Sequence, residues 1–140
     1  MNMADSVRKV RYSYLMVPNR AGTGAAVLAR LREAGVDLVA YSGFPASGGK
    51  AQIDLVTEDT AGLRRAAKAS GWRLSAIKKG FLVQGDDRMG AVHRHLQKLA
   101  AAKVSVVAAD AVSAGKGRYG MILWVKAKDY VRAARALGAR

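Results

Sequence analysis

The stretch Leu15–Gly22, LMVPNRAG, recurs in outline at Val83–Gly90, VQGDDRMG. Each copy contains the end of an apolar strand, a short polar turn and a glycine, and an amphipathic segment follows it. Continued without a gap, the alignment pairs further apolar positions: Leu28 with Leu96, Leu31 with Leu99, Val36 with Val104, and Leu38 with Val106. A repeat of this length indicates a duplicated domain and not a solenoid.

The first copy is predicted to fold as strand, helix, strand, strand, helix, strand. Alternating apolar residues predict strands over 10–17, 36–41, 51–57 and 72–77. Helical spacing predicts one helix that begins at an Asn19 N-cap and stops at Gly35. A second helix is expected from Asp59 or Thr60 to Gly71, and residues 42–50 form a hairpin loop.

The second copy repeats this order but ends early. Its predicted strands cover 81–84, 104–112 and 119–125, and its predicted helices cover 88–102 and 129–137. The chain then stops at Arg140, which leaves one sheet position unfilled. We expect another element to fill it, either a strand of the first unit or a strand of a second protomer.

These elements predict an α+β fold of two ferredoxin-like βαββαβ units, the second truncated. The first unit spans residues 8–78 and the second spans 79–140. Right-handed strand–helix–strand crossovers in antiparallel sheets place the helices on one face of each sheet. Small sheets of this kind leave faces and edges exposed, so a homodimer is expected.

Composition limits the remaining possibilities. The chain has 140 residues, with 24 Lys and Arg against 10 Asp and Glu, giving a formal charge of +14 that suggests an acidic partner. Cysteine is absent, which excludes disulfides, thiolate metal sites and thiol catalysis. No apolar run approaches the roughly 20 residues of a membrane span, and no secretory signal is recognisable. We therefore expect a cytoplasmic protein with no membrane contact, and the high Ala, Gly and Arg content suggests a bacterial source.

No constellation of catalytic or metal-binding residues is recognisable. His93 and His95 lie two positions apart on a predicted helix and would point to opposite faces, so they are not expected to share a metal. Asp86 and Asp87 are adjacent in a turn, where solvated carboxylates are expected and not an acid–base pair. The glycine-rich residues 47–50 lack the pattern of a phosphate-binding loop. The sequence predicts no enzyme activity and no cofactor.

The repeated motif resembles the opening of an ACT domain. The resemblance rests on residues 17–22, 26–28 and 33–38 of the first unit, and on 87–90 and 104–106 of the second. It covers nearly the whole chain as a tandem pair. It implies a regulatory module that binds an amino acid or similar small metabolite at interfaces between paired units, between the first strand–helix turn of one unit and the second strand of its neighbour. A partner enzyme or regulator would receive the signal.

The chemistry of a strand–helix turn supports such a site. Free N–H groups and the helix dipole at a helix N-terminus favour a carboxylate ligand. The residues predicted to bind the ligand are Asn19, Arg20, Ala21, Gly22 and Thr23 in the first unit, and Asp87, Arg88, Met89 and Gly90 in the second. The first turn is the better candidate, because Asp86 and Asp87 would repel a carboxylate in the second. The alternative is that the turn binds no ligand: Asn19 only caps the helix, and Gly22 only packs against the sheet.

Nucleic-acid binding is the main alternative function. Basic residues are spread along the chain, and a ferredoxin-like sheet can bind RNA through aromatic residues on its central strands. Only 6% of the residues are aromatic, with Tyr12 and Tyr14 the closest approach to such a pattern. The sequence therefore favours a regulatory protein over a basic nucleic-acid-binding protein.

Overall fold

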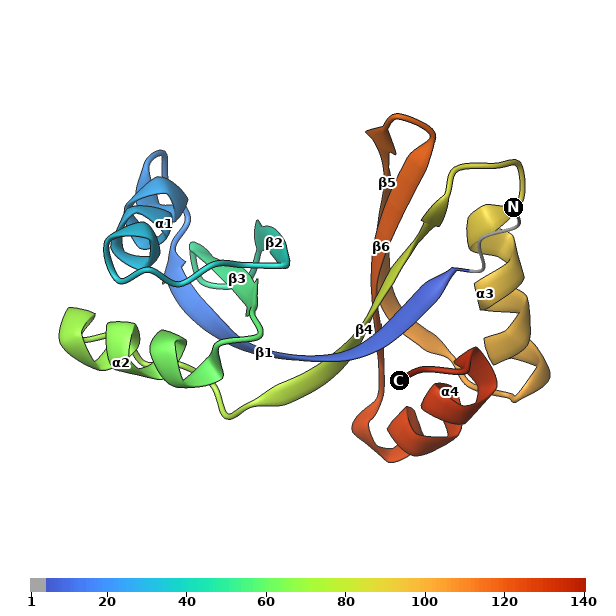
Figure 1. Cartoon of the computed structure of the whole chain (residues 1–140). Helices are drawn as coiled ribbons and strands as arrows, with labels where there is room; N and C mark the ends of the chain where they lie inside the picture. Colours follow the sequence, from blue (N-terminus) through green and yellow to red (C-terminus); the bar gives the residue numbers. More distant parts are fainter. Residues whose placement is uncertain (1–4) are drawn as a thin grey trace. The chain divides into compact units, whose positions relative to one another are not determined.

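The computed structural model describes residues 5–140 (Figure 1). Its strands are β1 (Ser6–Pro18), β2 (Ala40–Pro45), β3 (Lys50–Val56), β4 (Lys78–Asp86), β5 (Val106–Gly115) and β6 (Arg118–Val125). Its helices are α1 (Thr23–Glu33), α2 (Thr60–Ser70), α3 (Ala91–Ala101) and α4 (Tyr130–Leu137), with a 3₁₀ turn at Ala127–Asp129. Within this part of the chain, no helix has the length and apolar character needed to cross a membrane.

The strands run in the order β2-β3-β1-β4-β6-β5, and the chain divides into two compact units. The N-terminal unit consists of residues 11–78, and the C-terminal unit consists of residues 5–10 and 79–140. Residues 8–10, which the sequence analysis placed in the first unit, therefore group with the C-terminal unit. Every strand pair with a defined register is antiparallel, and the α+β, ferredoxin-like fold class is confirmed.

The N-terminal unit has its helices on one face of its sheet. Alternate residues of β1 and β3 are buried on that face, as period-two alternation dictates. They form one core with residues of α1 and α2: Leu15, Val17, Ile53 and Leu55 from the strands, and Val27, Leu31, Leu63 and Ala66 from the helices. Asp59 accepts a hydrogen bond from the Gly62 N–H at 2.9 Å and caps α2, which confirms the expected helix start.

The C-terminal unit repeats this arrangement with larger side chains. Its core joins the strands to α3 and α4 through Val7, Phe81, Val83, Met121 and Leu123 on the sheet and Leu99, Tyr130, Ala133 and Leu137 on the helices. The rings of Phe81 and Tyr130 are stacked with their centroids 4.6 Å apart. The Tyr130 hydroxyl donates to the Gly80 carbonyl at 3.0 Å, so this buried polar group is satisfied.

The strand that the second copy lacks is supplied by the start of the chain. Because β1 lies next to β4 and residues up to 10 belong to the C-terminal unit, the first part of β1 fills the vacant sheet position. The chain end lies against it: the Lys9 N–H donates to the Arg140 carbonyl at 2.9 Å, and the Arg140 N–H donates to the Val7 carbonyl at 3.0 Å. The expectation that a strand of the first unit fills this position is confirmed.

Two predicted strands differ most from the structure, and the ends of the others shift by up to four residues. Residues 72–77 form no regular strand, because the Ser75 hydroxyl, in place of a backbone carbonyl, accepts the Tyr14 N–H at 2.9 Å. Only the Ser75 N–H, donated to the Tyr14 carbonyl at 2.9 Å, continues the ladder. The strand expected at 36–41 begins at Ala40; before it, the Leu38 N–H donates to the Asp37 carboxylate at 3.1 Å and not to a neighbouring strand. The hairpin loop is correspondingly shorter, with β2 reaching Pro45 and β3 starting at Lys50.

Candidate functional site

The turn between β1 and α1 differs from the predicted helix start. Helix α1 begins at Thr23, and its N-cap is Gly22 in a left-handed conformation with φ of 89°, without a side-chain cap. The prediction that Asn19 caps this helix is wrong: its N–H donates to the Gly49 carbonyl at 2.9 Å, which ties the end of β1 to the β2–β3 hairpin. Glycine is required at position 22 because a side chain would be strained at this φ. The first N–H groups of α1 consequently have no side-chain acceptor.

A hollow of about 260 Å³ lies beside this turn. Three of the predicted residues line it, namely Asn19, Arg20 and Thr23, whereas Ala21 and Gly22 do not. The remaining lining residues are Val17, Pro18, Gly24, Tyr41, Gly43, Phe44, Pro45, Ala51 and Ile53. The lining contains an arginine and no carboxylate, and its other residues are largely apolar. Such a hollow suits a small anionic molecule with an apolar body.

Tyr41 is a lining residue that the sequence analysis missed. A Cβ atom built on Gly24 would lie 3.0 Å from the Tyr41 hydroxyl oxygen, and one built on Gly43 would lie 3.3 Å from it. The phenol therefore lies close to the first turn of α1 and to its own strand, where an added Cβ atom would be in tight contact with it. Tyr41 is 44% exposed. The signal in the sequence is the spacing of Tyr41 and Gly43, which share one face of a strand.

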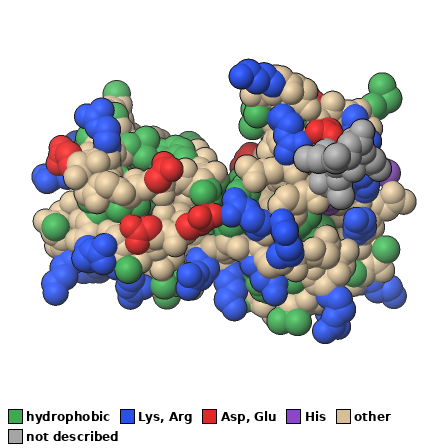
Figure 2. Space-filling model, in the orientation of Figure 1, with side chains coloured by type: hydrophobic (Ala, Val, Ile, Leu, Met, Phe, Trp, Pro, Cys, Tyr) green, Lys and Arg blue, Asp and Glu red, His purple; other side chains and the backbone are tan. Residues whose placement is uncertain are grey.

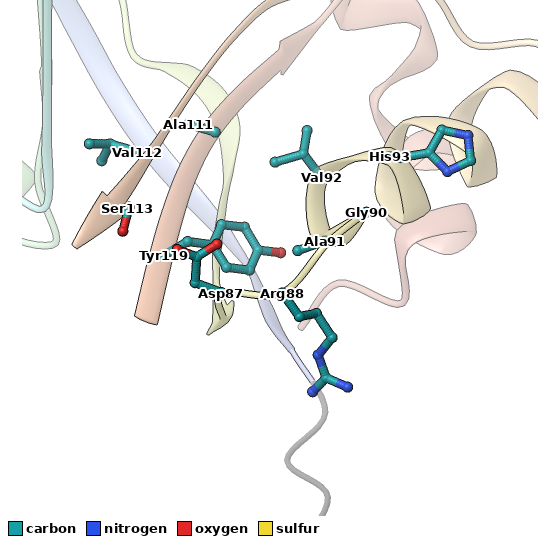
Figure 3. A pocket seen from close by; sticks show the side chains of 10 residues that line it. All are labelled: Asp87, Arg88, Gly90, Ala91, Val92, His93, Ala111, Val112, Ser113 and Tyr119. Carbon is teal, nitrogen blue, oxygen red and sulfur yellow. The ribbon is translucent and has the colours of Figure 1, made fainter. Parts of the chain in front are cut away.

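The C-terminal unit has an equivalent hollow of about 310 Å³ (Figure 3). Three predicted residues, Asp87, Arg88 and Gly90, line it together with Ala91, Val92, His93, Ala111, Val112, Ser113 and Tyr119. Helix α3 begins at Ala91 with Gly90 as its left-handed N-cap, φ 78°, again without a side-chain cap. The expected start at residue 88 is therefore three residues early. Met89 is fully exposed and does not line the hollow.

The two hollows differ in charge. Asp87 lines the C-terminal hollow, and the neighbouring Asp86 is 2.7 Å from Arg118 Nη1 and 3.5 Å from Arg88 Nη2. Arg88 therefore already has a carboxylate partner in its own turn. In the N-terminal hollow, by contrast, no acidic residue is present to neutralise Arg20. An anionic ligand is consequently favoured in the N-terminal hollow over the C-terminal one.

The two histidines of α3 lie in different environments. His93 lines the C-terminal hollow, whereas His95 is buried and its Nε2 is 2.7 Å from a carboxylate oxygen of Asp5. Within residues 5–140, no group of three or more His, Asp or Glu side chains is arranged to hold a metal ion. The Asp5–His95 pair was not foreseen, because 90 positions separate the two residues and no local pattern links them.

Comparison with solved structures defines the class of fold. Protein BT0572 from Bacteroides thetaiotaomicron matches with a TM-score of 0.72 at 14% identity, over 94% of this chain and 88% of that one. The regulatory subunit of aspartate kinase from Thermus thermophilus matches with a TM-score of 0.66 at 13% identity, over 96% of this chain and 94% of that one. Aspartate kinase from Clostridium acetobutylicum matches with a TM-score of 0.59 at 15% identity, over 95% of this chain but 33% of the enzyme.

The chain therefore has the fold of ACT-like regulatory domains of aspartate kinase. No protein-family model matches the sequence, and no curated protein matches it significantly. At these identities the likeness establishes the fold, and function has to be argued from the site.

Proposed function

We propose that this protein is a non-catalytic regulatory module, a tandem pair of ACT-like units, that binds an amino acid or a similar small metabolite. The ligand would occupy the hollow beside Asn19, Arg20 and Thr23 in the N-terminal unit. The observation that carries this proposal is an uncapped helix N-terminus that opens beside an arginine-containing, carboxylate-free hollow. The fold shared with regulatory subunits of aspartate kinase supports a regulatory role.

The lining chemistry matches the parts of an amino acid. Free N–H groups of α1 and the Arg20 guanidinium can bind an α-carboxylate. The Asn19 side-chain oxygen can accept a hydrogen bond from an α-ammonium group. The apolar residues Phe44 and Ile53 can contact the ligand's side chain. A hollow of about 260 Å³ limits the ligand to a small molecule.

Regulation follows if the ligand binds one arrangement of the protein better than another. A ligand can shift an equilibrium only by its differential affinity for the two states. We expect the protein to act as a homodimer and to pass the shift to a partner enzyme or regulator. Light scattering tests the dimer, and a clean monomer would contradict that part of the proposal.

A thermal-shift screen with the twenty amino acids tests the ligand. A ligand that binds only the folded state raises Tm in proportion to the logarithm of its concentration. For any amino acid that stabilises the protein, its decarboxylated amine should give no shift, because the carboxylate is the anchoring group. Asn19→Ala should weaken the response, whereas the exposed Met89→Ala should not. No stabilisation by any amino acid would contradict the proposal.

The positive charge favours a second candidate, a nucleic-acid-binding function. Lys and Arg side chains are prominent on the surface of both units (Figure 2), and the chain carries a formal charge of +14. Exposed basic residues on α2 include Arg64, Arg65 and Lys68. Tight, strongly salt-dependent binding of a single-stranded oligonucleotide, with no response to amino acids, would support this candidate over the first.

A further inference from the structure

Three donors converge on one carboxylate oxygen inside the C-terminal unit. Arg94 Nη2 lies 2.7 Å from Asp5 Oδ2, and the Tyr119 hydroxyl lies 2.5 Å from the same oxygen. His95 Nε2 lies 2.7 Å from it as well. The Asp5 side chain is 3% exposed and that of His95 is 2% exposed. A carboxylate is thus held out of water by an arginine, an imidazole and a phenol.

The donors and the acceptor come from different parts of the fold. Arg94 and His95 are consecutive on α3, and Tyr119 lies on β6. Asp5 precedes β1, so its segment contributes only the acceptor. Charge-assisted hydrogen bonds of this kind are how proteins recognise carboxylates. The three donors therefore lie on α3 and β6, which the core of the unit holds in place, and Asp5 contributes none of them.

The backbone leaves room for a carboxylate at this place. A Cβ atom built on Gly85 of β4 would collide with Asp5 Oδ1, so a side chain at position 85 would fill the space that the carboxylate occupies. Asp5 Oδ1 and His95 Nδ1 are buried without a hydrogen-bond partner among the described residues. Arg94 is 44% exposed, which gives one side of the site access to solvent.

The protonation states agree with a donor site for an anion. Burial acts to raise the pKa of Asp5, but hydrogen bonds from Tyr119, His95 and Arg94 outweigh it and lower the pKa below its usual value. Burial, together with the hydrogen bond to Asp5, raises the pKa of Tyr119. Asp5 therefore accepts as a carboxylate and Tyr119 donates as a neutral phenol.

We propose that Arg94, His95 and Tyr119 form a binding site for a small carboxylate, and that the side chain of Asp5 is its attached, resident ligand. An attached ligand competes at a high effective concentration, so a free carboxylate is excluded while Asp5 is in place. Removing the Asp5 side chain opens the site to formate, the smallest carboxylate. Tyr119 also lines the hollow of this unit, which places the two sites next to each other. This inference is independent of the proposed amino-acid site, which contains none of the three donors.

Rescue of Asp5→Gly by formate tests the proposal. Tm of the full-length variant is measured at pH 7 in increasing sodium formate, against sodium chloride at equal ionic strength. We expect a saturable, formate-specific rise of about 3 °C or more in the variant and none in the unsubstituted protein. The matched control is Asp86→Gly, which removes an arginine-paired carboxylate of the same unit that is exposed; it should show no formate-specific rise.

A second substitution locates the bound formate. Asp5→Gly combined with Arg94→Gln should lose the formate response, because the guanidinium is the strongest donor. If Asp5→Gly does not fold in chloride, recovery of the folded circular-dichroism signal in formate becomes the readout. Identical behaviour of Asp5→Gly in formate and chloride, folded or unfolded, would overturn the proposal. So would a formate response that survives Arg94→Gln.

Discussion

The strand–helix turns of the two units have the same backbone conformation but carry different side chains. In both, a glycine with positive φ precedes the helix, no side chain caps it, and a hollow lies beside it. The N-terminal hollow contains Arg20 and no carboxylate, whereas the C-terminal one contains Asp87 next to an arginine that Asp86 already binds. The two turns therefore have the same backbone conformation but different charges beside the helix start.

Each unit contains a buried carboxylate, and the pKa values of the two are shifted in opposite directions. Asp5 in the C-terminal unit has three donors, and its pKa is lowered although burial acts to raise it. Asp54 in the N-terminal unit is 5% exposed and accepts one bond from Gln52 at 2.9 Å, and burial raises its pKa. Burial acts to raise the pKa of both carboxylates, and only at Asp5 do the hydrogen-bond donors outweigh it.

Truncating the core should affect both units similarly and most strongly. Leu31→Ala and Leu99→Ala, at aligned positions that are 1% and 0% exposed, should each lower the free energy of unfolding by about 2–5 kcal/mol. Urea unfolding followed by tryptophan fluorescence measures this, since each unit contains one tryptophan, Trp72 and Trp124. Met89→Ala is the exposed control. A loss below about 1 kcal/mol at one position would show that the two cores are not equivalent.

Removing the Asp5 charge should cost about 2 kcal/mol at neutral pH, because Asp5→Asn takes the charged acceptor away from Arg94, His95 and Tyr119. The folded-state pKa of Asp5 is lowered, so its contribution is present above the unfolded-state pKa of about 4 and is lost as the pH falls through the lower folded-state pKa. The difference between the two proteins should therefore shrink on acidification. Urea titrations at pH 7 and below pH 4 measure it, and a gap that stays constant would contradict this assignment.

The affinity for a ligand should depend on the N-terminal turn and not on the C-terminal turn. Arg20→Ala should weaken binding of a stabilising amino acid by about tenfold, roughly 1.4 kcal/mol, because a charge-assisted bond to the carboxylate is lost. Arg88→Ala, at the aligned position of the other unit, should leave the affinity unchanged. Titration calorimetry compares the two variants. Equal weakening by both, or weakening by Arg88→Ala alone, would place the ligand elsewhere.

The smallest effect is expected at Asp54 and has the opposite sign. Because burial raises the folded-state pKa of Asp54, the ionised side chain reduces stability at neutral pH. Asp54→Asn should therefore raise the free energy of unfolding by about 1 kcal/mol at pH 7. The gain should shrink as the pH falls and vanish well below pH 4, where the carboxyl group is protonated in both states. A loss of stability at pH 7 would show that the carboxylate has a stabilising partner.

Local signals predicted most of the fold. Gly35 and Gly71 adopt the left-handed conformation that ends a helix, and the Asp59 cap was foreseen because it depends on residues close in sequence. The Asn19 cap was wrong because Gly22 turns the chain and delays the helix. The strand at 72–77 was wrong because a side chain, Ser75, replaces a backbone acceptor. The turn at Gly22 and the side-chain acceptor at Ser75 do not alter the spacing of apolar residues, from which helices and strands were predicted.

The candidate site was predictable in part. The turn residues Asn19, Arg20 and Thr23 were identified because a repeated motif marks them, and all three line the hollow. Tyr41 was missed because its position depends on the pairing of β2 with β3, which brings the phenol toward α1. The contacts of Asp5 with Arg94, His95 and Tyr119 were missed for a similar reason. The start of the chain packs into the C-terminal unit, which brings together residues 89 to 114 positions apart.

Backbone amide chemical shifts test the central claim most directly, because they report each turn separately. The protein is titrated with the most stabilising amino acid or, if none stabilises it, with an equimolar mixture of all twenty, and its ¹H–¹⁵N spectrum is recorded. The proposed function predicts saturable shifts concentrated at residues 20–24 of the N-terminal turn, with little change at 88–92. Shifts confined to 88–92, or no saturable shift at either turn, would contradict it.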